Sequence, residues 1–180
     1  MVRTIQVVQH DPAWKIAYAR EAALLSDVFA NSLRSIHHVG STSLSGVPAK
    51  PIIDILVVLA DTASIARFSP TMEQLGYLVR GECLDAEIPG TPGRFYFSKD
   101  TGGLRTHQVH ACAIGHFQID DMLTLRDYLR EHPDRAAAYG ALKQSLAPMH
   151  RHDTVGYMRG KDAFVKLLLT DAREWARRTE

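Results

Sequence analysis

The sequence has few cysteines, no long apolar run and almost no excess charge of either sign. Its 180 residues include only two cysteines, Cys83 and Cys112, which form neither a CxxC pair nor a disulfide framework. No apolar run approaches the ~18 residues that a membrane-spanning helix needs. We therefore expect a cytoplasmic protein with no membrane contact and with reduced thiols, one of them in the core.

The charges of the chain nearly cancel. There are 21 Lys and Arg residues against 20 Asp and Glu residues, which gives a formal net charge of +1. Domains with a broad nucleic-acid surface usually have a pI above ~9, whereas this sequence has a pI of about 7.9. The composition thus argues against a broad nucleic-acid surface and gives no support for an acidic tail. A chain of this length can bury a full core without metal or disulfide links, so we expect one domain over residues 1–180.

Hydrophobic periodicity divides this domain into a sheet-containing core, residues 1–117, and a three-helix half, residues 118–180. Two helices are expected in the core, at residues 12–31 and 62–76, and the second half has helices starting near residues 120, 133 and 154. Six strands are expected, at residues 5–8, 34–39, 52–59, 77–79, 94–98 and 106–114. The run 52–59 is almost wholly β-branched and apolar, which indicates a central strand. We predict an α+β fold with a mixed β-sheet flanked by helices and a helical C-terminal half.

The most informative segment is 39–56, which reads as a strand, a Gly-Ser turn and a second strand that carries an Asp at its start. Small residues let backbone N–H groups approach a phosphate closely. The candidate phosphate-binding residues of the turn are therefore Gly40, Ser41 and Thr42. Asp54 could hold a hard cation that bridges phosphates. The Gly-to-Lys spacing does not fit a Walker A loop, and the alternative is a plain loop with an Asp that caps a turn.

A second segment, residues 105–112, carries two histidines on one expected strand. Side chains alternate along a strand, so His107 and His110 face opposite sides and can share a metal only if a bulge intervenes. A lone His in an apolar strand is usually a core residue, but proximity of His110 to Asp54 would favour a functional role. The same alternatives apply to the pair beside the glycine turn, His37 and His38.

Basic side chains flank both segments, at Lys50, Arg94, Lys99 and Arg105. An Arg can bind phosphate through two parallel hydrogen bonds, and a Lys supplies a point charge. We take three of them, Lys50, Arg94 and Arg105, as candidate phosphate ligands, with ordinary surface charge as the alternative. We give little functional weight to the residues near the start of the last helix, Tyr157, Arg159 and Lys161.

Five stretches of this sequence resemble the GrpB family, and they occur in that family's order along nearly the whole chain. They are GSTSLSGVPAKPIIDILV, PGRFYFSK, RTHQVHA, LRDYLREHPDRAAAYGALKQSLA and GYMRGKDAFV. The resemblance implies a fold similar to that of the nucleotidyltransferase superfamily. It also implies that some relatives are fused to, or associated with, dephospho-CoA kinase. The family name by itself implies no reaction.

The nucleotidyltransferase pattern implied by this resemblance carries over only in part. Its Gly-Ser turn corresponds to Gly40-Ser41 and its first metal carboxylate to Asp54. The position of its second carboxylate holds Leu56, and that of its third holds His110. Two-metal transfer needs several anionic ligands, so one Asp with one or two His fits a single transition metal or Zn²⁺ better than two Mg²⁺. The acidic segment offers two further carboxylates, Glu82 and Glu87.

Three hypotheses remain open. The first is a nucleotidyltransferase-like enzyme that uses an NTP, an unknown acceptor and a divalent metal (Mg, Mn or Zn) on Asp54 and His110, with His110 as an alternative general base. The second is a degenerate module that binds a nucleotide or phosphometabolite without turnover, as Leu56 suggests. The third is a metal-dependent phosphoester hydrolase that uses Asp54, His107 and His110. All three predict a nucleotide or phosphorylated small molecule as the partner.

Overall fold

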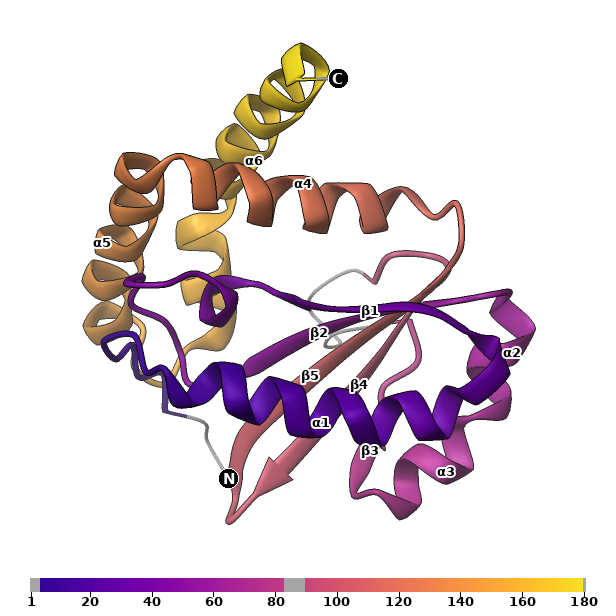
Figure 1. The fold of residues 1–180 in the computed structure, drawn as a ribbon. Coiled ribbons are helices and arrows are strands. Elements are labelled where there is room, and N and C mark those ends of the chain that lie inside the picture. The colour runs from indigo at the N-terminus through magenta and orange to yellow at the C-terminus, as the bar shows by residue number, and fades with distance from the viewer. Residues whose placement is uncertain (1–3, 83–89, 180) are drawn as a thin grey trace.

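The protein is built on one mixed sheet of five strands with helices on both faces (Figure 1). The computed structural model describes residues 4–82 and 90–179. The strands lie in the order β1 (Leu33–Val39), β2 (Ile53–Leu59), β5 (Leu104–Ala113), β4 (Arg94–Thr101) and β3 (Tyr77–Val79). β2 and β5 are parallel, whereas the other neighbouring pairs are antiparallel. The predicted mixed sheet and α+β class are confirmed.

β2 lies inside the sheet and is buried on both faces, as its apolar run predicts. Ile55 and Val57 point into the larger core, which is covered by three N-terminal helices. These are α1 (Ala13–Phe29), α2 (Thr62–Arg67) and α3 (Ser69–Gln74). Leu56 and Val58 point to the other face, where α4 (Phe117–Glu131) covers them. The two faces of one strand therefore face different helices.

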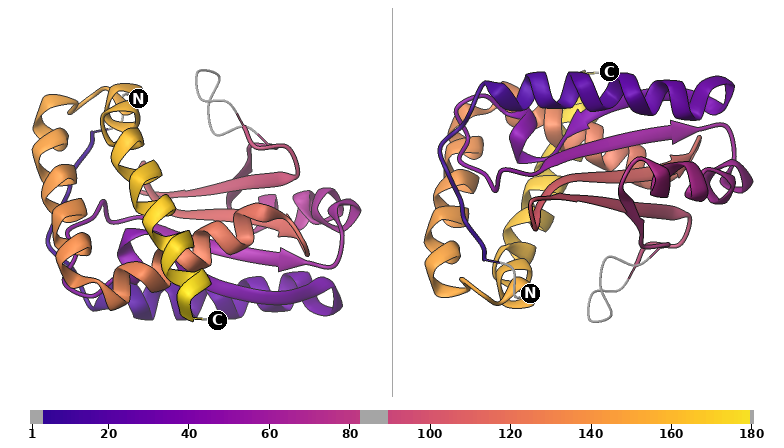
Figure 2. Two further views of the ribbon diagram at one scale, coloured as in Figure 1. Left: turned by 90° about the horizontal axis from the view of Figure 1, so that it is seen from above. Right: turned by 90° about the horizontal axis from the view of Figure 1, so that it is seen from below.

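The C-terminal half is helical, as predicted, and consists of α4, α5 (Pro133–Met149) and α6 (Thr154–Thr179). α5 and the first part of α6 lie beyond the end of the sheet where β1 ends and β2 begins (Figures 1 and 2). Leu44 and Val47 from the connection between these strands are buried among the C-terminal helices. The strand connection and the helical half therefore share one cluster of apolar side chains. None of the described helices is both long and apolar enough to span a membrane.

Two predicted elements differ from the structure. The expected strand at residues 5–8 is reduced to a single bridge between Val8 and Ala49, because Ile5 packs against the C-terminal helices and its N–H donates to the carbonyl of Arg151. The expected helix at residues 62–76 is divided into α2 and α3. Pro70 has no N–H to continue the helical ladder, so the chain restarts after Phe68.

Cys112 is a free, buried thiol on β5. This confirms the prediction that one cysteine lies in the core, while Cys83 falls outside the described residues. Burial raises the pKa of the Cys112 thiol to about 11, and the nearby Arg94 opposes the shift. The thiol is therefore an apolar packing element at neutral pH.

Candidate functional site

Gly40, Asp54 and His110 lie together at the end of the sheet that faces α5 and α6. Gly40 directly follows β1, and Asp54 is the second residue of β2. Asp54 is opposite Val39 of β1 and Gln108 of β5, and His110 is opposite Leu56. Residues that are opposite one another or two apart share a face, so Asp54 and His110 both lie on the sheet face covered by α4.

Gly40 packs directly against the carboxylate of Asp54. Its φ of +67° and ψ of −172° place it in a backbone region that is essentially restricted to glycine. A Cβ at this position would overlap Oδ2 of Asp54 and lie 3.0 Å from its Cβ and Cγ. The glycine thus lets the turn close over the carboxylate, while the Asp54 side chain keeps 26% of its surface exposed.

His110 faces Asp54 from the neighbouring parallel strand. Its Nε2 lies 3.8 Å from Oδ1 of Asp54, which is beyond hydrogen-bond distance. The other ring nitrogen, Nδ1, is buried and has no hydrogen-bond partner among the described residues. The carboxylate and the imidazole therefore face each other without a direct bond, and a third group placed between them could contact both.

Arg105 reaches the same face because the β4–β5 ladder contains a bulge. Lys99 is opposite His107 and Asp100 is opposite Arg105, which leaves Thr106 as an extra residue. The Arg105 side chain is 4% exposed; it forms an ion pair with Asp100, and its Nη1 donates to the Tyr96 hydroxyl at 3.1 Å. Its Nη2 is buried without a hydrogen-bond partner in the described part of the chain.

The helical half adds Lys143, which sequence analysis did not identify. This α5 residue is only 3% exposed. Its Nζ lies 4.4 Å from the centre of the Tyr139 ring and has no hydrogen-bond partner among residues 4–82 and 90–179. Burial, together with the charges of Lys161 and Lys50, lowers the pKa of Lys143 to about 7, and the charge of Asp54 opposes this shift. Lys143 is therefore within electrostatic reach of all three.

Lys143 thus lies near two further lysines and near the carboxylate of Asp54, and each of the three lysines comes from a different element. Lys50 precedes β2, and its Nζ lies 5.1 Å from the centre of the Tyr157 ring. Lys143 belongs to α5, and Lys161 belongs to α6. Like charges that are held together in a poorly solvated place repel one another. The arrangement therefore favours a bound anion, whose charge would relieve that repulsion.

Other predicted residues lie elsewhere. His107 is on the opposite sheet face, where its Nε2 lies 4.0 Å from Oε2 of Glu21 on α1. Arg94 lies at the far end of β4 and donates to Gln118 on α4 at 2.7 Å. The structure therefore does not assemble the expected group of Asp54, His107 and His110, because the bulge at residue 106 precedes both histidines and leaves them on opposite faces.

The remaining candidates are held by local contacts. The Thr42 hydroxyl donates to the carbonyl of Ile52 at 3.2 Å and hydrogen-bonds the ring of His38 at 3.0 Å, so it is already engaged within the fold. Ser41 begins the single 3₁₀ turn that follows Gly40. The Glu82 carboxylate accepts from the N–H of Gly93. The other proposed source of a carboxylate, Glu87, lies outside the described residues.

The metal-ligating side chains among the described residues do not fit a two-metal centre. Leu56, at the position expected for a second carboxylate, is fully buried in the core. No group of three or more His, Cys, Asp or Glu side chains in the described residues is arranged to hold a metal ion. Asp54 and His110 supply only two donors, which a single cation could use if a ligand completed its shell.

Comparisons with known proteins agree with the sequence motifs. A family model described as "GrpB protein" matches residues 4–171. The UPF0157 protein YqkA of Bacillus subtilis is 36% identical over 173 residues, which is 96% of this chain and 48% of that protein, so the chain spans about half of this relative. The crystal structure of the conserved protein GrpB from Enterococcus faecalis superposes with a TM-score of 0.86 and 35% identity, over 94% of this chain and 99% of that one.

A slighter likeness links the chain to the Cid1 poly(U) polymerase, with a TM-score of 0.45 and 14% identity over 77% of this chain and 45% of that chain. This likeness is too small to bear on activity. The family model, by contrast, covers nearly the whole sequence, and the Enterococcus faecalis structure shares its fold. The chain belongs to the GrpB family.

Proposed function

We propose that the surface around Asp54 binds the phosphate groups of a nucleotide or of another phosphorylated small molecule. The observation that carries this proposal is the buried amino group of Lys143, which has no hydrogen-bond partner in the described part of the chain. A buried cation without a partner is costly. A phosphate oxygen would supply the missing acceptor and the compensating charge.

The neighbouring groups suit the same ligand. A phosphate monoester carries about −1.5 to −2 charges at neutral pH. It would therefore balance the charge of several nearby cations more fully than a carboxylate with a single negative charge. Lys50 and Lys161 lie close enough to Lys143 to lower its pKa, and Arg105 has an unsatisfied buried N–H. The backbone of the Gly40-Ser41 turn would add N–H donors to a phosphate at the edge of this site.

Nucleotidyl transfer is the second candidate, and it is favoured by the position of the Asp54 carboxylate beside the His110 imidazole. In that reaction an acceptor hydroxyl would lose its proton to His110, its oxygen would bond to the α-phosphorus, and the bond to pyrophosphate would break. A single Mn²⁺ or Zn²⁺ held by Asp54 would neutralise phosphate charge; His110 would act as the base in that case, or as a second ligand of the metal if another group took the proton. The buried Leu56 argues against two metals, so we place binding without turnover first.

The proposal is tested by measuring the thermal stability and binding heat of the protein with ATP, AMP and pyrophosphate, with and without Mg²⁺, Mn²⁺ and Zn²⁺. A ligand at 100 times its dissociation constant stabilises the native state by about 2.7 kcal/mol. We expect Lys143→Met to abolish this gain. Lys166→Met is the matched control, because Lys166 is an exposed α6 lysine that pairs with Asp162.

The outcomes separate the two candidates. Binding that needs Lys143, without release of pyrophosphate, supports the module that binds without turnover. Pyrophosphate release that is lost in both Asp54→Asn and His110→Gln supports transfer. If no probe binds under any metal condition, or if Lys143→Met binds as tightly as the wild type, the phosphate-binding proposal is wrong.

A further inference from the structure

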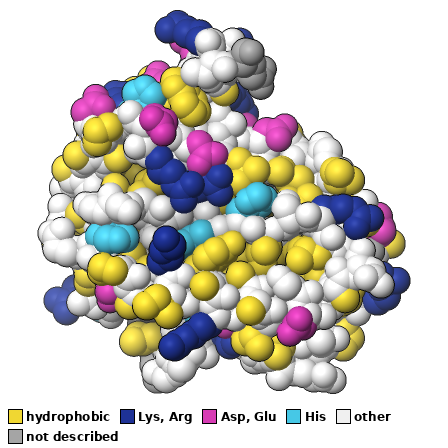
Figure 3. All heavy atoms as spheres, in the orientation of Figure 1, with side chains coloured by type: hydrophobic (Ala, Val, Ile, Leu, Met, Phe, Trp, Pro, Cys, Tyr) yellow, Lys and Arg dark blue, Asp and Glu magenta, His cyan; other side chains and the backbone are white. Residues whose placement is uncertain are grey.

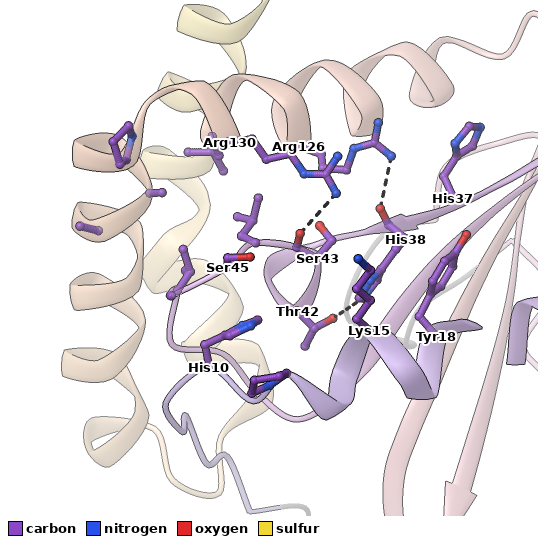
Figure 4. A pocket seen from close by; sticks show the side chains of 18 of the residues that line it. His10, Lys15, Tyr18, His37, His38, Thr42, Ser43, Ser45, Arg126 and Arg130 are labelled. Atoms are coloured by element: carbon purple, nitrogen blue, oxygen red, sulfur yellow. Dashed lines mark hydrogen bonds between the residues drawn. The ribbon is translucent and has the colours of Figure 1, made fainter. Parts of the chain in front are cut away.

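A pocket lies against the connection between β1 and β2, and Lys143 is not among the residues that line it. It is a pocket of about 940 Å³ between α1, the outer edge of β1, the connection after β1, and α4 with the start of α5 (Figure 4). Neither Asp54 nor His110 lines it. Pockets that hold small organic ligands usually measure about 300–1,000 Å³, so this one is large enough for such a molecule.

The charged side chains of this pocket are all basic. Lysine, arginine and histidine side chains gather on this face of the molecule (Figure 3). Among the described residues, no Asp or Glu lines the pocket, and its basic and imidazole side chains are Lys15, Arg126, Arg130, His10, His37 and His38. The electrostatic potential inside it therefore favours an anion.

The two arginines are held in place before any ligand binds. Asp127, which lies outside the lining, accepts from Nε and Nη2 of Arg126 at 2.8 Å and from Nη1 of Arg130 at 3.2 Å. Arg126 also donates to the carbonyl of His38, and Arg130 to the carbonyl of Ser43 (Figure 4). One carboxylate thus fixes two guanidinium groups and leaves a net positive charge between them. Such preorganisation lowers the entropic cost of binding.

One wall of the pocket is a neutral aromatic surface. The rings of Tyr18 and His38 are stacked, with centroids 4.6 Å apart and planes 7° from parallel. Burial lowers the pKa of His38 to about 4, although Asp54 opposes the shift, so its imidazole is uncharged at neutral pH. Apolar side chains from the helical half, including Leu129 and Ala136, line the facing side. The pocket thus combines aromatic and aliphatic walls with cationic side chains.

We propose that this pocket is a second binding site for a small organic oxyanion, a phosphate ester or a carboxylate that carries a planar apolar body. Arg126 and Arg130 would bind the oxyanion, because guanidinium groups match both phosphate and carboxylate. The Tyr18–His38 wall and the aliphatic side chains would contact the body. The proposal does not depend on the function assigned to the Asp54 surface.

The test uses probes that share an aromatic ring and differ in charge: phenyl phosphate, phthalate and neutral benzyl alcohol. Binding is measured by titration calorimetry with the wild type and with Ala137→Phe, which places a ring into the pocket from an exposed lining position on α5. Ala138→Phe is the matched control, since Ala138 is also exposed on α5 and does not line the pocket. Arg130→Gln tests the charge.

We expect at least one of the two anions to bind with a dissociation constant below about 1 mM. Its affinity should fall about tenfold or more in Ala137→Phe and in Arg130→Gln, because each variant removes space or a charged hydrogen bond. It should be unchanged in Ala138→Phe and in Lys143→Met. A preference for phenyl phosphate or for phthalate identifies the oxyanion. The proposal is overturned if neither anion binds, if benzyl alcohol binds as well as they do, or if Ala137→Phe and Ala138→Phe behave alike.

Discussion

Gly40 closes over Asp54 so tightly that no side chain larger than a hydrogen atom fits between them. Asp54 lies on β2 opposite Val39, the last residue of the antiparallel strand β1, and Gly40 directly follows Val39. The position of the turn and the orientation of the carboxylate are therefore linked. A change in one must displace the other.

Replacement of Gly40 by Ala tests this link. The backbone of Gly40 has a conformation that costs other residues about 1–3 kcal/mol, and the added Cβ would also overlap Asp54. We expect Gly40→Ala to lower the free energy of unfolding by at least about 2 kcal/mol, measured by urea denaturation. The control is Gly46→Ala, which has a φ of +75° but no atom within 4 Å of a Cβ. Equal losses in the two variants would show that contact with Asp54 contributes nothing.

The buried Lys143 should make stability depend on pH. Its pKa falls from about 10.5 in the unfolded chain to about 7 in the native state. Between these values the unfolded chain holds the proton and the folded chain does not, so native stability should rise with pH. The slope has an upper limit of about 1.4 kcal/mol per pH unit for one group. Urea titrations from pH 7 to pH 10 should show this rise in the wild type and not in Lys143→Met.

Binding of an anion should reverse part of this shift. A phosphate beside Lys143 raises the pKa of its ammonium, so the complex takes up a proton between pH 7 and pH 10. Binding heats measured in two buffers with different ionisation enthalpies would detect that uptake. We expect phosphate affinity to decline as the pH rises above about 7. An affinity that increases over this range would contradict a direct role for Lys143.

Lys143 also shows what could have been predicted from the sequence. Tyr139, Gly140, Leu146 and Ala147 share the buried side of α5, and Lys143 falls on the same helical stripe. A lysine in an apolar stripe is a signal that the sequence contained. Its proximity to Asp54 was not predictable, because 89 positions separate the two residues and the tertiary packing of α5 against the β1–β2 connection brings them together.

The strands, and the site residues that they carry, were easier to predict from the sequence. The apolar run at residues 52–59 identified the central strand, and side-chain alternation correctly separated His107 from His110. Arg105 reached the site by a bulge, which no local pattern indicates. The pocket between α1 and α4 could not be predicted from the sequence either, apart from its two adjacent histidines, His37 and His38. Its walls come from elements that lie more than 80 residues apart.

Glu21 should be important for stability and not for ligand binding at the Asp54 surface. Its Oε1 accepts from Lys99 and from the Tyr77 hydroxyl, each at 2.8 Å, inside the core beneath α1. Burial raises the pKa of Glu21, but these hydrogen bonds outweigh it and leave the pKa lowered. Glu21→Ala would leave the buried hydroxyl of Tyr77 and the partly buried ammonium of Lys99 without this acceptor. We expect a loss of about 3 kcal/mol in the free energy of unfolding.

The control for this loss is a pair on the surface. Asp162 and Lys166 form an exposed ion pair on α6, and Asp162→Asn should change the stability by less than about 0.5 kcal/mol. Because the pKa of Glu21 is lowered, its stabilising effect is present above the unfolded-state pKa and is lost on acidification. The Glu21→Ala deficit should therefore shrink as the pH falls through the acidic range. A deficit that does not depend on pH would contradict an ionised Glu21.

Cys112 should resist alkylation in the native protein. The thiolate is the reactive form, and a pKa of about 11 in place of about 9 reduces its population roughly a hundredfold at pH 8. Burial reduces access further. In a Cys83→Ser background, mass spectrometry should find Cys112 unmodified by iodoacetamide until urea unfolds the chain. Rapid modification of the folded protein would show that β5 opens on the timescale of the reaction.

The three lysines of this cluster, Lys50, Lys143 and Lys161, are divided unequally between the two halves of the chain. Residues 1–117 contribute Lys50, whereas Lys143 and Lys161 belong to the helices that follow. The sign of the charge at this place is therefore decided by how the helical half docks onto the end of the sheet. If the helices moved away, Lys50 would be the one lysine of this cluster left beside the sheet, and the surface would lose most of its attraction for phosphate. The measured affinity for an anion would thus show whether the helical half is docked onto the sheet.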